Sequence, residues 1–256
     1  MNRINQLFQQ KKSQVLSVYF TAGYPRLDDT LPVLRALQSN GVDLVEIGVP
    51  FSDPMADGVV IQNSSHVALE NGMSIRKLFE QLTDVRKEID IPLVMMGYLN
   101  PIMQFGFEAF CRECSRVGVD GMIIPDLPMS DFLSEYKLIA EKYGLRFIFL
   151  ITPETSDERI LEIDNHTDGF IYMVSSAAVT GTQTSFDSRK AYFDRINKMN
   201  LKNPRLIGFG VSNKATLDAA FEFAHGAIIG SAFIKALQED ADVEQSVKLL
   251  LSKLKK

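Results

Sequence analysis

Tryptophan is absent from this chain of 256 residues, and cysteine occurs only twice. Two cysteines cannot cross-link a secreted scaffold of this size, because such scaffolds depend on several disulfides. The opening residues, 1–12, lack the apolar core of a secretory signal peptide. No apolar run approaches the roughly 18 residues that a membrane-spanning helix needs. We therefore expect a cytoplasmic protein.

An excess of basic charge is also missing, since 27 Lys and Arg residues stand against 32 Asp and Glu residues. Nucleic-acid-binding domains normally carry a basic excess or a basic stripe, so this class of function is excluded. With 46% hydrophobic and 23% charged residues, the chain has the composition of an ordinary globular protein with a sizeable core.

Metal-binding patterns are scarce. Cys111 and Cys114 form a C-x-x-C, but it lies within a helical pattern over residues 107–117 and no second ligand pair follows. The three histidines are far apart in the sequence. We expect two ordinary helix thiols and no metal site.

Short apolar runs alternate with amphipathic helical patterns along the whole chain. Near-continuous apolar strands are typical of a parallel sheet covered on both faces, and eight strands are the number that closes a (β/α)8 barrel. The sequence predicts a single α/β domain over residues 1–256, a TIM barrel with an extra N-terminal helix. A doubly wound open sheet is the alternative, but the G-x-G-x-x-G fingerprint after the first strand is absent. The expected strands are Leu16–Phe20, Leu44–Val49, Pro92–Tyr98, Gly121–Asp126, Arg146–Ile151, Gly169–Ser175, Arg205–Gly210 and Gly226–Ser231.

Acidic residues occur where such a barrel carries its active site, at the carboxyl ends of the strands. Strand alternation directs Glu46 into the barrel, where burial would raise its pKa toward the range useful in acid-base catalysis. A structural glutamate paired with a neighbouring donor is the alternative. The loop that follows carries Asp53 and Asp57, and Asp126 ends the fourth strand. Turn formation alone would also explain these three aspartates.

Small residues lie at or just after the ends of the last three expected strands: Gly181, Gly210, and the pair Gly230 and Ser231. Exposed backbone N–H groups at a helix start bind anions, and barrel enzymes often bind phosphate after strands seven and eight. The polar segment 175–190 after strand six is interpreted as a lid over the substrate, with a merely exposed loop as the alternative. Because no strand carries a lysine in its core, a Schiff-base mechanism has no obvious nucleophile. The mechanism that remains is acid-base catalysis by carboxyl groups on a phosphorylated small molecule.

The stretches EIGVPFSDPMADG, MGYLNPI, IIPDLP, AAVTG, IGFGVS and IIGSAFIK resemble the tryptophan synthase alpha chain family over essentially the whole length. The resemblance implies a lyase in tryptophan biosynthesis that cleaves indole-3-glycerol phosphate to indole and glyceraldehyde 3-phosphate. It implies that Glu46 is the acid-base residue and that Asp57 binds the indole nitrogen. The implied substrate-binding residues are Phe20, Tyr172, Thr180, Gly181, Gly210, Gly230 and Ser231.

One segment departs from the family pattern. Many members have an S-R-x-G-V-T-G lid, whereas this chain has Ser176 and Ala178 in place of the arginine and the glycine. The missing arginine removes an ion pair for the closed lid, and alanine is stiffer than glycine.

The resemblance also implies a partner, a pyridoxal-phosphate-dependent beta chain in an alpha2-beta2 complex that receives indole. No cofactor is expected in this chain itself. Contacts with the partner are expected from loops at the active end, where the product leaves. The expected contact residues are Asp53, Pro54, Asn100, Pro101 and Pro128.

Two other functions compete with this interpretation. A phosphoribosyl isomerase or an indole-glycerol-phosphate synthase would use the same phosphate glycines but not the pairing of Glu46 with Asp57. A non-catalytic subunit that only activates its partner would not need an inward-facing carboxylate.

Overall fold

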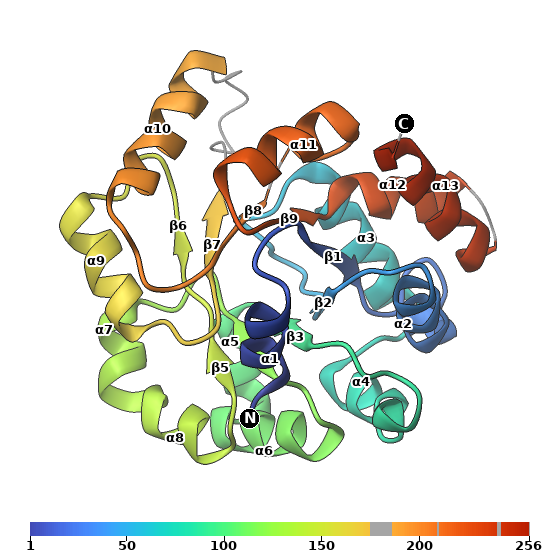
Figure 1. The fold of residues 1–256 in the computed structure, drawn as a ribbon. Coiled ribbons are helices and arrows are strands. Elements are labelled where there is room, and N and C mark those ends of the chain that lie inside the picture. Colours follow the sequence, from blue (N-terminus) through green and yellow to red (C-terminus); the bar gives the residue numbers. More distant parts are fainter. Residues whose placement is uncertain (175–185, 209, 240–241, 256) are drawn as a thin grey trace.

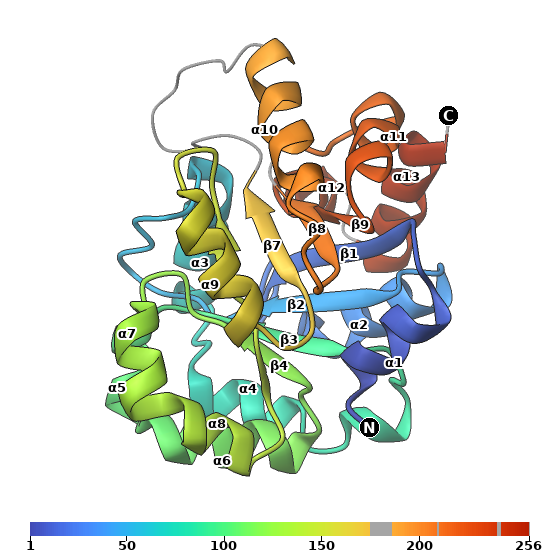
Figure 2. The ribbon, with the colours of Figure 1, turned by 60° about the vertical axis from the view of Figure 1, so that its left-hand side comes forward.

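The computed structural model describes residues 1–174, 186–208, 210–239 and 242–255, and its strands form a curled parallel sheet surrounded by helices (Figures 1 and 2). The order along the sheet is β5-β4-β3-β2-β1-β9-β8-β7-β6. The strand segments of the described residues are β1 (Val15–Thr21), β2 (Leu44–Gly48), β3 (Leu93–Met96), β4 (Gly121–Ile123), β5 (Arg146–Phe147), β6 (Leu150–Ile151), β7 (Ile171–Val174), β8 (Arg205–Gly208) and β9 (Gly226–Ile229).

The segments β5 and β6 are two halves of one strand, so the barrel has the eight strands that the sequence predicts. The first half pairs with β4, and the Ile148 N–H donates to the Met122 carbonyl at 3.0 Å. The second half pairs with β7, and the Tyr172 N–H donates to the Phe149 carbonyl at 3.0 Å. The strand therefore closes the barrel by bonding β4 and β7 with successive parts of its length.

Side chains of the strands divide into two packed layers by alternation. The barrel interior is filled by an apolar cluster that includes Leu44 of β2, Val94 of β3 and Ile228 of β9. Val45 and Ile47 of β2 belong to the other cluster, between the sheet and the helices. The inward orientation predicted for Glu46, which shares its face of β2 with Leu44, is thereby confirmed.

Helix α1 (Arg3–Gln10) lies across the amino-terminal end of the barrel, in front of the strands in Figure 1. Ile4 and Phe8 pack into the interior cluster. The Arg3 guanidinium pairs with the Asp120 carboxylate at 3.0 Å, just before β4. This extra helix closes the end opposite to the predicted active site.

The remaining helices surround the barrel. They are α2 (Thr30–Ser39), α3 (Val59–Glu70), α4 (Ile75–Gln81), α5 (Leu99–Phe105), α6 (Phe107–Val117), α7 (Met129–Asp131), α8 (Lys137–Lys142), α9 (Asp157–His166), α10 (Phe186–Lys198), α11 (Lys214–Phe223), α12 (Ser231–Glu239) and α13 (Val243–Lys255). Short 3-10 turns occupy Leu27–Asp29 and Val85–Lys87, and a π-helical turn occupies Phe132–Tyr136.

Two expectations about the helices have different outcomes. The helix predicted around the C-x-x-C is confirmed as α6, in which Cys111 and Cys114 are buried free thiols. The sequence also predicts one last helix from about Phe233 through the tail, whereas the structure divides this segment into α12 and α13. The Asp242 carboxylate accepts the Glu244 N–H at 2.9 Å and so starts a new helix.

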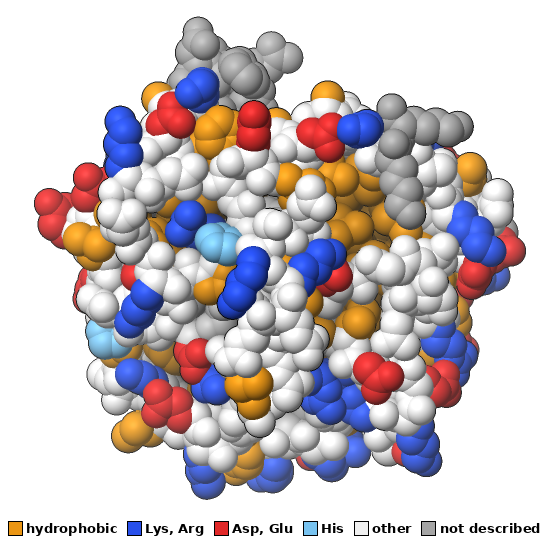
Figure 3. All heavy atoms as spheres, viewed as in Figure 1, with side chains coloured by type: hydrophobic (Ala, Val, Ile, Leu, Met, Phe, Trp, Pro, Cys, Tyr) orange, Lys and Arg blue, Asp and Glu red, His pale blue; other side chains and the backbone are white. Residues whose placement is uncertain are grey.

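Charged side chains of both signs are interspersed on the face shown in Figure 3, with no continuous basic patch. Among the described helices, none combines the length and the apolar character needed to cross a membrane.

Candidate active site at the carboxyl ends of the strands

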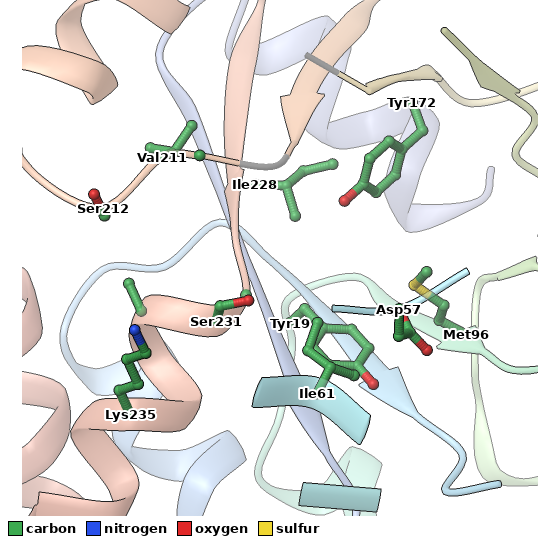
Figure 4. Close-up of a pocket in the computed structure, with 13 residues that line it drawn as sticks. Tyr19, Asp57, Ile61, Met96, Tyr172, Val211, Ser212, Ile228, Ser231 and Lys235 are labelled. Atoms are coloured by element: carbon green, nitrogen blue, oxygen red, sulfur yellow. The ribbon is translucent and has the colours of Figure 1, made fainter. Parts of the chain in front are cut away.

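A cavity of about 210 Å³ lies at the carboxyl ends of the strands (Figure 4). Strands β1, β3, β7 and β9 contribute to its wall, together with the loops after β2 and β8 and the first turns of α3 and α12. The lining residues are Tyr19, Asp57, Ile61, Met96, Tyr172, Gly210, Val211, Ser212, Ile228, Gly230, Ser231, Ala232 and Lys235. The cavity thus brings together the acidic loop and the glycine-rich strand ends that the sequence singled out.

Glu46 projects into the barrel from the middle of β2 and is fully buried. Its Oε1 atom accepts a hydrogen bond from the Ser17 hydroxyl at 2.9 Å, while Oε2 is buried without a partner among the described residues. Burial raises the pKa of Glu46 to about 8, and the Ser17 hydrogen bond opposes part of that rise. The carboxyl group is therefore mostly protonated at neutral pH and can act as an acid.

Asp57 sits just before α3 in the loop after β2 and is 9% exposed. The Tyr98 hydroxyl donates to its Oδ2 atom at 2.9 Å and accepts the Ala56 N–H at 2.9 Å, so one phenol holds both the carboxylate and its loop. Burial raises the pKa of Asp57 to about 6, and the Tyr98 hydrogen bond opposes the rise. Asp57 is therefore mostly ionised at neutral pH.

The two carboxyl groups thus occupy opposite protonation states at pH 7 within one region of the barrel. The charges of both carboxyl groups act on two tyrosines, Tyr19 and Tyr172. Tyr19 pairs with Glu46 in the β1–β2 register and lines the cavity beside Asp57. Burial, and then the charges of Glu46 and Asp57, raise the pKa of Tyr172 well above its ordinary value. Burial also raises the pKa of Tyr19, so both phenols stay protonated and can serve as hydrogen-bond donors.

The resemblance implies that Phe20 binds the substrate, and this expectation is wrong. Phe20 is fully buried in the outer cluster, between β1 and the helices. Tyr19, one residue earlier, faces the cavity instead. Strand alternation is the reason, because Ser17, Tyr19 and Thr21 share the inward face of β1. Ser17, which contacts Glu46, marks that face in the sequence.

Two glycines that the sequence analysis did not single out make room for these phenols. A Cβ atom on Gly48 would lie 2.2 Å from the Tyr19 hydroxyl oxygen, and one on Gly208 would lie 2.3 Å from that of Tyr172. Each glycine is the last residue of its strand, Gly48 in β2 and Gly208 in β8. The absence of side chains at these positions allows the tyrosine rings to extend across the barrel mouth.

The glycine-rich strand ends form the other part of the cavity. Gly210 has a φ of +81°, a conformation that favours glycine, and Gly230 directly precedes the first turn of α12. The Ser231 hydroxyl points toward the cavity in Figure 4. Thr180, Gly181 and most of the predicted lid lie outside the described residues.

The expected partner-contact residues differ in exposure. Asp53, Asn100 and Pro128 are exposed, and Pro101 is half-buried. Pro54 is buried within its own loop, so its expected role as a surface contact is not supported. Near Asn100 and Pro101, the surface between the loop after β2, α4 and α5 is hollowed by about 590 Å³.

Asp126, the third acid at a strand end, has a local role. It is exposed, and its carboxylate accepts the Leu99 N–H at 2.9 Å, which links the loop after β4 to the start of α5. Within the described residues, no group of three His, Cys, Asp or Glu side chains is placed to hold a metal ion.

Comparison with known proteins places this geometry in a family context. The sequence model described as "Tryptophan synthase alpha chain" matches residues 5–255. The tryptophan synthase alpha chain of Bacteroides thetaiotaomicron is 60% identical over 256 residues, covering 100% of both chains. The solved alpha subunit of Legionella pneumophila superimposes with a TM-score of 0.90 at 34% identity, covering 99% of this chain and 97% of that one. A chain of tryptophan synthase from M. tuberculosis, solved in an aminoacrylate-bound form, superimposes with a TM-score of 0.86 at 27% identity, covering 99% and 98%.

Proposed function

This chain belongs to the tryptophan synthase alpha chain family, and from that premise we propose how its cavity cleaves indole-3-glycerol phosphate. As an alpha chain it is a lyase of tryptophan biosynthesis. The observation that carries the mechanism is the pair of buried carboxyl groups, with Glu46 protonated and Asp57 ionised at neutral pH. When two environments separate the pKa values of two carboxyl groups in this way, the protonated group can act as the acid and the ionised group can stabilise positive charge.

The first step transfers the Glu46 proton to C3 of the indole ring. The ring becomes a 3H-indolium cation whose positive charge lies on the nitrogen. The Asp57 carboxylate accepts the N–H of this cation and stabilises the charge, as a preorganised anion does in a partly buried site. Because the protonated ring is now an electron sink, the reaction proceeds without an iminium formed by a lysine.

The second step regenerates Glu46. Its carboxylate, formed in the first step, takes the proton from the glycerol hydroxyl next to the ring. The bond between C3 and the glycerol carbon breaks, its electron pair returns to the ring, and an aldehyde forms. Indole and glyceraldehyde 3-phosphate leave, and the proton is again on Glu46.

The rest of the cavity orients the substrate for these steps. Tyr19, Ile61, Met96 and Tyr172 provide apolar surface for the indole ring near Asp57. The backbone around Gly210, Gly230 and Ser231 supports the phosphate group at the start of α12. We assign Thr180 and Gly181 to the same phosphate site from the family motif alone.

Product analysis tests this function. The purified chain is incubated with indole-3-glycerol phosphate, and both products are measured. Indole is followed by its fluorescence, with little background because the chain contains no tryptophan. We expect equal amounts of indole and glyceraldehyde 3-phosphate. Consumption of the substrate without indole, or no consumption even with a beta chain present, would refute the proposal.

We further propose that a beta chain binds the carboxyl-end face of the barrel and receives indole there. The exposed side chains of Met55 and Val59 flank the Asp57 loop, and they are 81% and 69% exposed. The hollow beside Asn100 adjoins the same loop. Burial of these apolar side chains by a partner would stabilise the complex. Pyridoxal phosphate would be held by the beta chain, in an alpha2-beta2 assembly located in the cytoplasm, with residues 1–256 acting as one domain.

Asn100→Asp tests the partner surface. The substitution adds a negative charge that would have to be desolvated in the interface. It should therefore weaken the association with a cognate beta chain at least about tenfold. Indole release by the free alpha chain should stay unchanged, because Asn100 is outside the catalytic cavity. Sedimentation and indole release are measured on the same samples.

The matched control is Asn165→Asp, an exposed change near the opposite end of the barrel, which should leave the association unaffected. Equal loss of association in both variants would contradict the assigned face. Unchanged association in Asn100→Asp would exclude Asn100 from the interface.

A further inference from the structure

Lys235 lines the catalytic cavity but has no place in the mechanism above. It belongs to α12, the helix that begins at Ser231 beside Gly230. Figure 4 shows Lys235 and Ser212 on one side of the cavity, and Asp57 and Met96 on the other. The cavity therefore has a cationic side and an acidic side.

Helix geometry directs this lysine toward the phosphate-binding backbone. Residues four positions apart lie on one face of a helix, so Lys235 shares a face with Ser231. Side chains in a helix are tilted toward its amino terminus, which brings the long lysine side chain back along α12. In Figure 4 the Lys235 side chain extends from α12 on the side of the cavity where Ser212 and Ser231 lie.

Lys235 also lacks a counterion in the part of the chain that the structure describes. Neighbouring lysines are engaged: Lys248 pairs with Glu244 at 3.0 Å on α13, and Lys214 pairs with Asp218 on α11. No described carboxylate or carbonyl oxygen accepts a hydrogen bond from Lys235 Nζ. Its ammonium group is therefore available to an anion in the cavity.

We propose that Lys235 is a substrate-positioning residue whose ammonium group binds the phosphate dianion of the substrate at the amino terminus of α12. This inference rests on the proposed function, because it assigns a counterion to the phosphate of the same substrate. The backbone N–H groups give the phosphate its location, and the lysine neutralises part of its charge. The phosphate is then held on the side away from Asp57, which orients the indole ring toward the acidic side.

Because the ammonium group is exposed, its contribution should be moderate and sensitive to salt. For Lys235→Met we expect KM for indole-3-glycerol phosphate to rise about tenfold, with kcat changed less than about threefold. The KM of the wild type should increase with ionic strength more steeply than that of the variant. Lys235→Arg should restore most of the affinity, since it keeps the charge.

The experiment compares wild type, Lys235→Met and Lys235→Arg with the control Lys248→Met, which removes an equal charge from the adjacent helix α13. Calorimetric titration with glycerol 3-phosphate measures phosphate binding independently of turnover. The inference holds if Lys235→Met is the only variant that binds this probe about tenfold more weakly than wild type, and if Lys235→Arg keeps most of the wild-type affinity. It is overturned if Lys235→Met binds the probe as tightly as wild type, or if Lys248→Met shows the same loss.

The two proposals fail in different ways. If wild type releases indole and Lys235→Met keeps its affinity for glycerol 3-phosphate, only the role of Lys235 is wrong. If wild type binds the probe through Lys235 but never cleaves indole-3-glycerol phosphate, the lysine stands as a phosphate ligand and the proposed reaction is wrong.

Discussion

Glu46→Gln is expected to lower the rate of indole release by a factor of about 100 to 10,000 while the barrel stays folded. Glutamine has nearly the same volume and can still accept the Ser17 hydroxyl hydrogen bond. It cannot donate a carboxyl proton to C3 of indole or take the proton from the glycerol hydroxyl. Both chemical steps are therefore impaired by one substitution that leaves packing intact. Steady-state indole release with saturating substrate measures the effect.

Glu70→Gln provides the matched control, because this glutamate lies on the surface of α3 and, among the residues that the structure describes, pairs with His66 at 3.2 Å. It should turn over at the wild-type rate. Circular dichroism and binding of glycerol 3-phosphate establish that Glu46→Gln is folded and still binds phosphate. Near-normal turnover in such a folded variant would exclude Glu46 as the acid.

Asp57→Asn should reduce turnover about 100-fold to 1,000-fold, the range seen when one preorganised electrostatic contact to a transition state is lost. The amide carries no negative charge, so it cannot stabilise the positive charge that develops on the indole nitrogen. The amide oxygen can still accept the Tyr98 hydroxyl, which keeps the loop before α3 in place. The fall should appear in kcat more than in KM, because the charge arises only during the reaction.

Asp84→Asn is the matched control, since Asp84 pairs with Lys87 at 3.0 Å on the surface. An Asp57→Asn variant as active as this control would show that the ring charge is stabilised by another group.

Sequence patterns predicted the barrel and the orientation of Glu46 because both follow from local rules. Apolar strands and helical periodicity mark each β/α unit, and alternation along β2 places Leu44 and Glu46 on one face. The same pattern of strands placed Gly210 and Gly230 at the ends of the last two strands, where they line the cavity.

Other features of the site depend on contacts between distant parts of the chain. The hydrogen bond between Tyr98 and Asp57 spans 41 residues, and no local pattern predicts it. Strand β1 carries Ser17, Tyr19 and Thr21 on its inward face and Phe20 on the outer one, so the Phe20 that the resemblance implied is one residue away from the residue that faces the cavity. Lys235 ends the family-like stretch IIGSAFIK, but a lysine in a helix is usually a surface residue, so its sequence position alone did not mark it as a ligand.

The pH dependence of kcat/KM reports directly on whether a protonated Glu46 and an ionised Asp57 act together. The fraction of protonated Glu46 falls above pH 8, and the fraction of ionised Asp57 falls below pH 6. We expect a bell-shaped profile for indole-3-glycerol phosphate cleavage, with a maximum between these values and a tenfold loss for each pH unit beyond about pH 8. A value of kcat/KM that keeps rising through pH 9 would contradict it, because Glu46 would then be required as a carboxylate from the start.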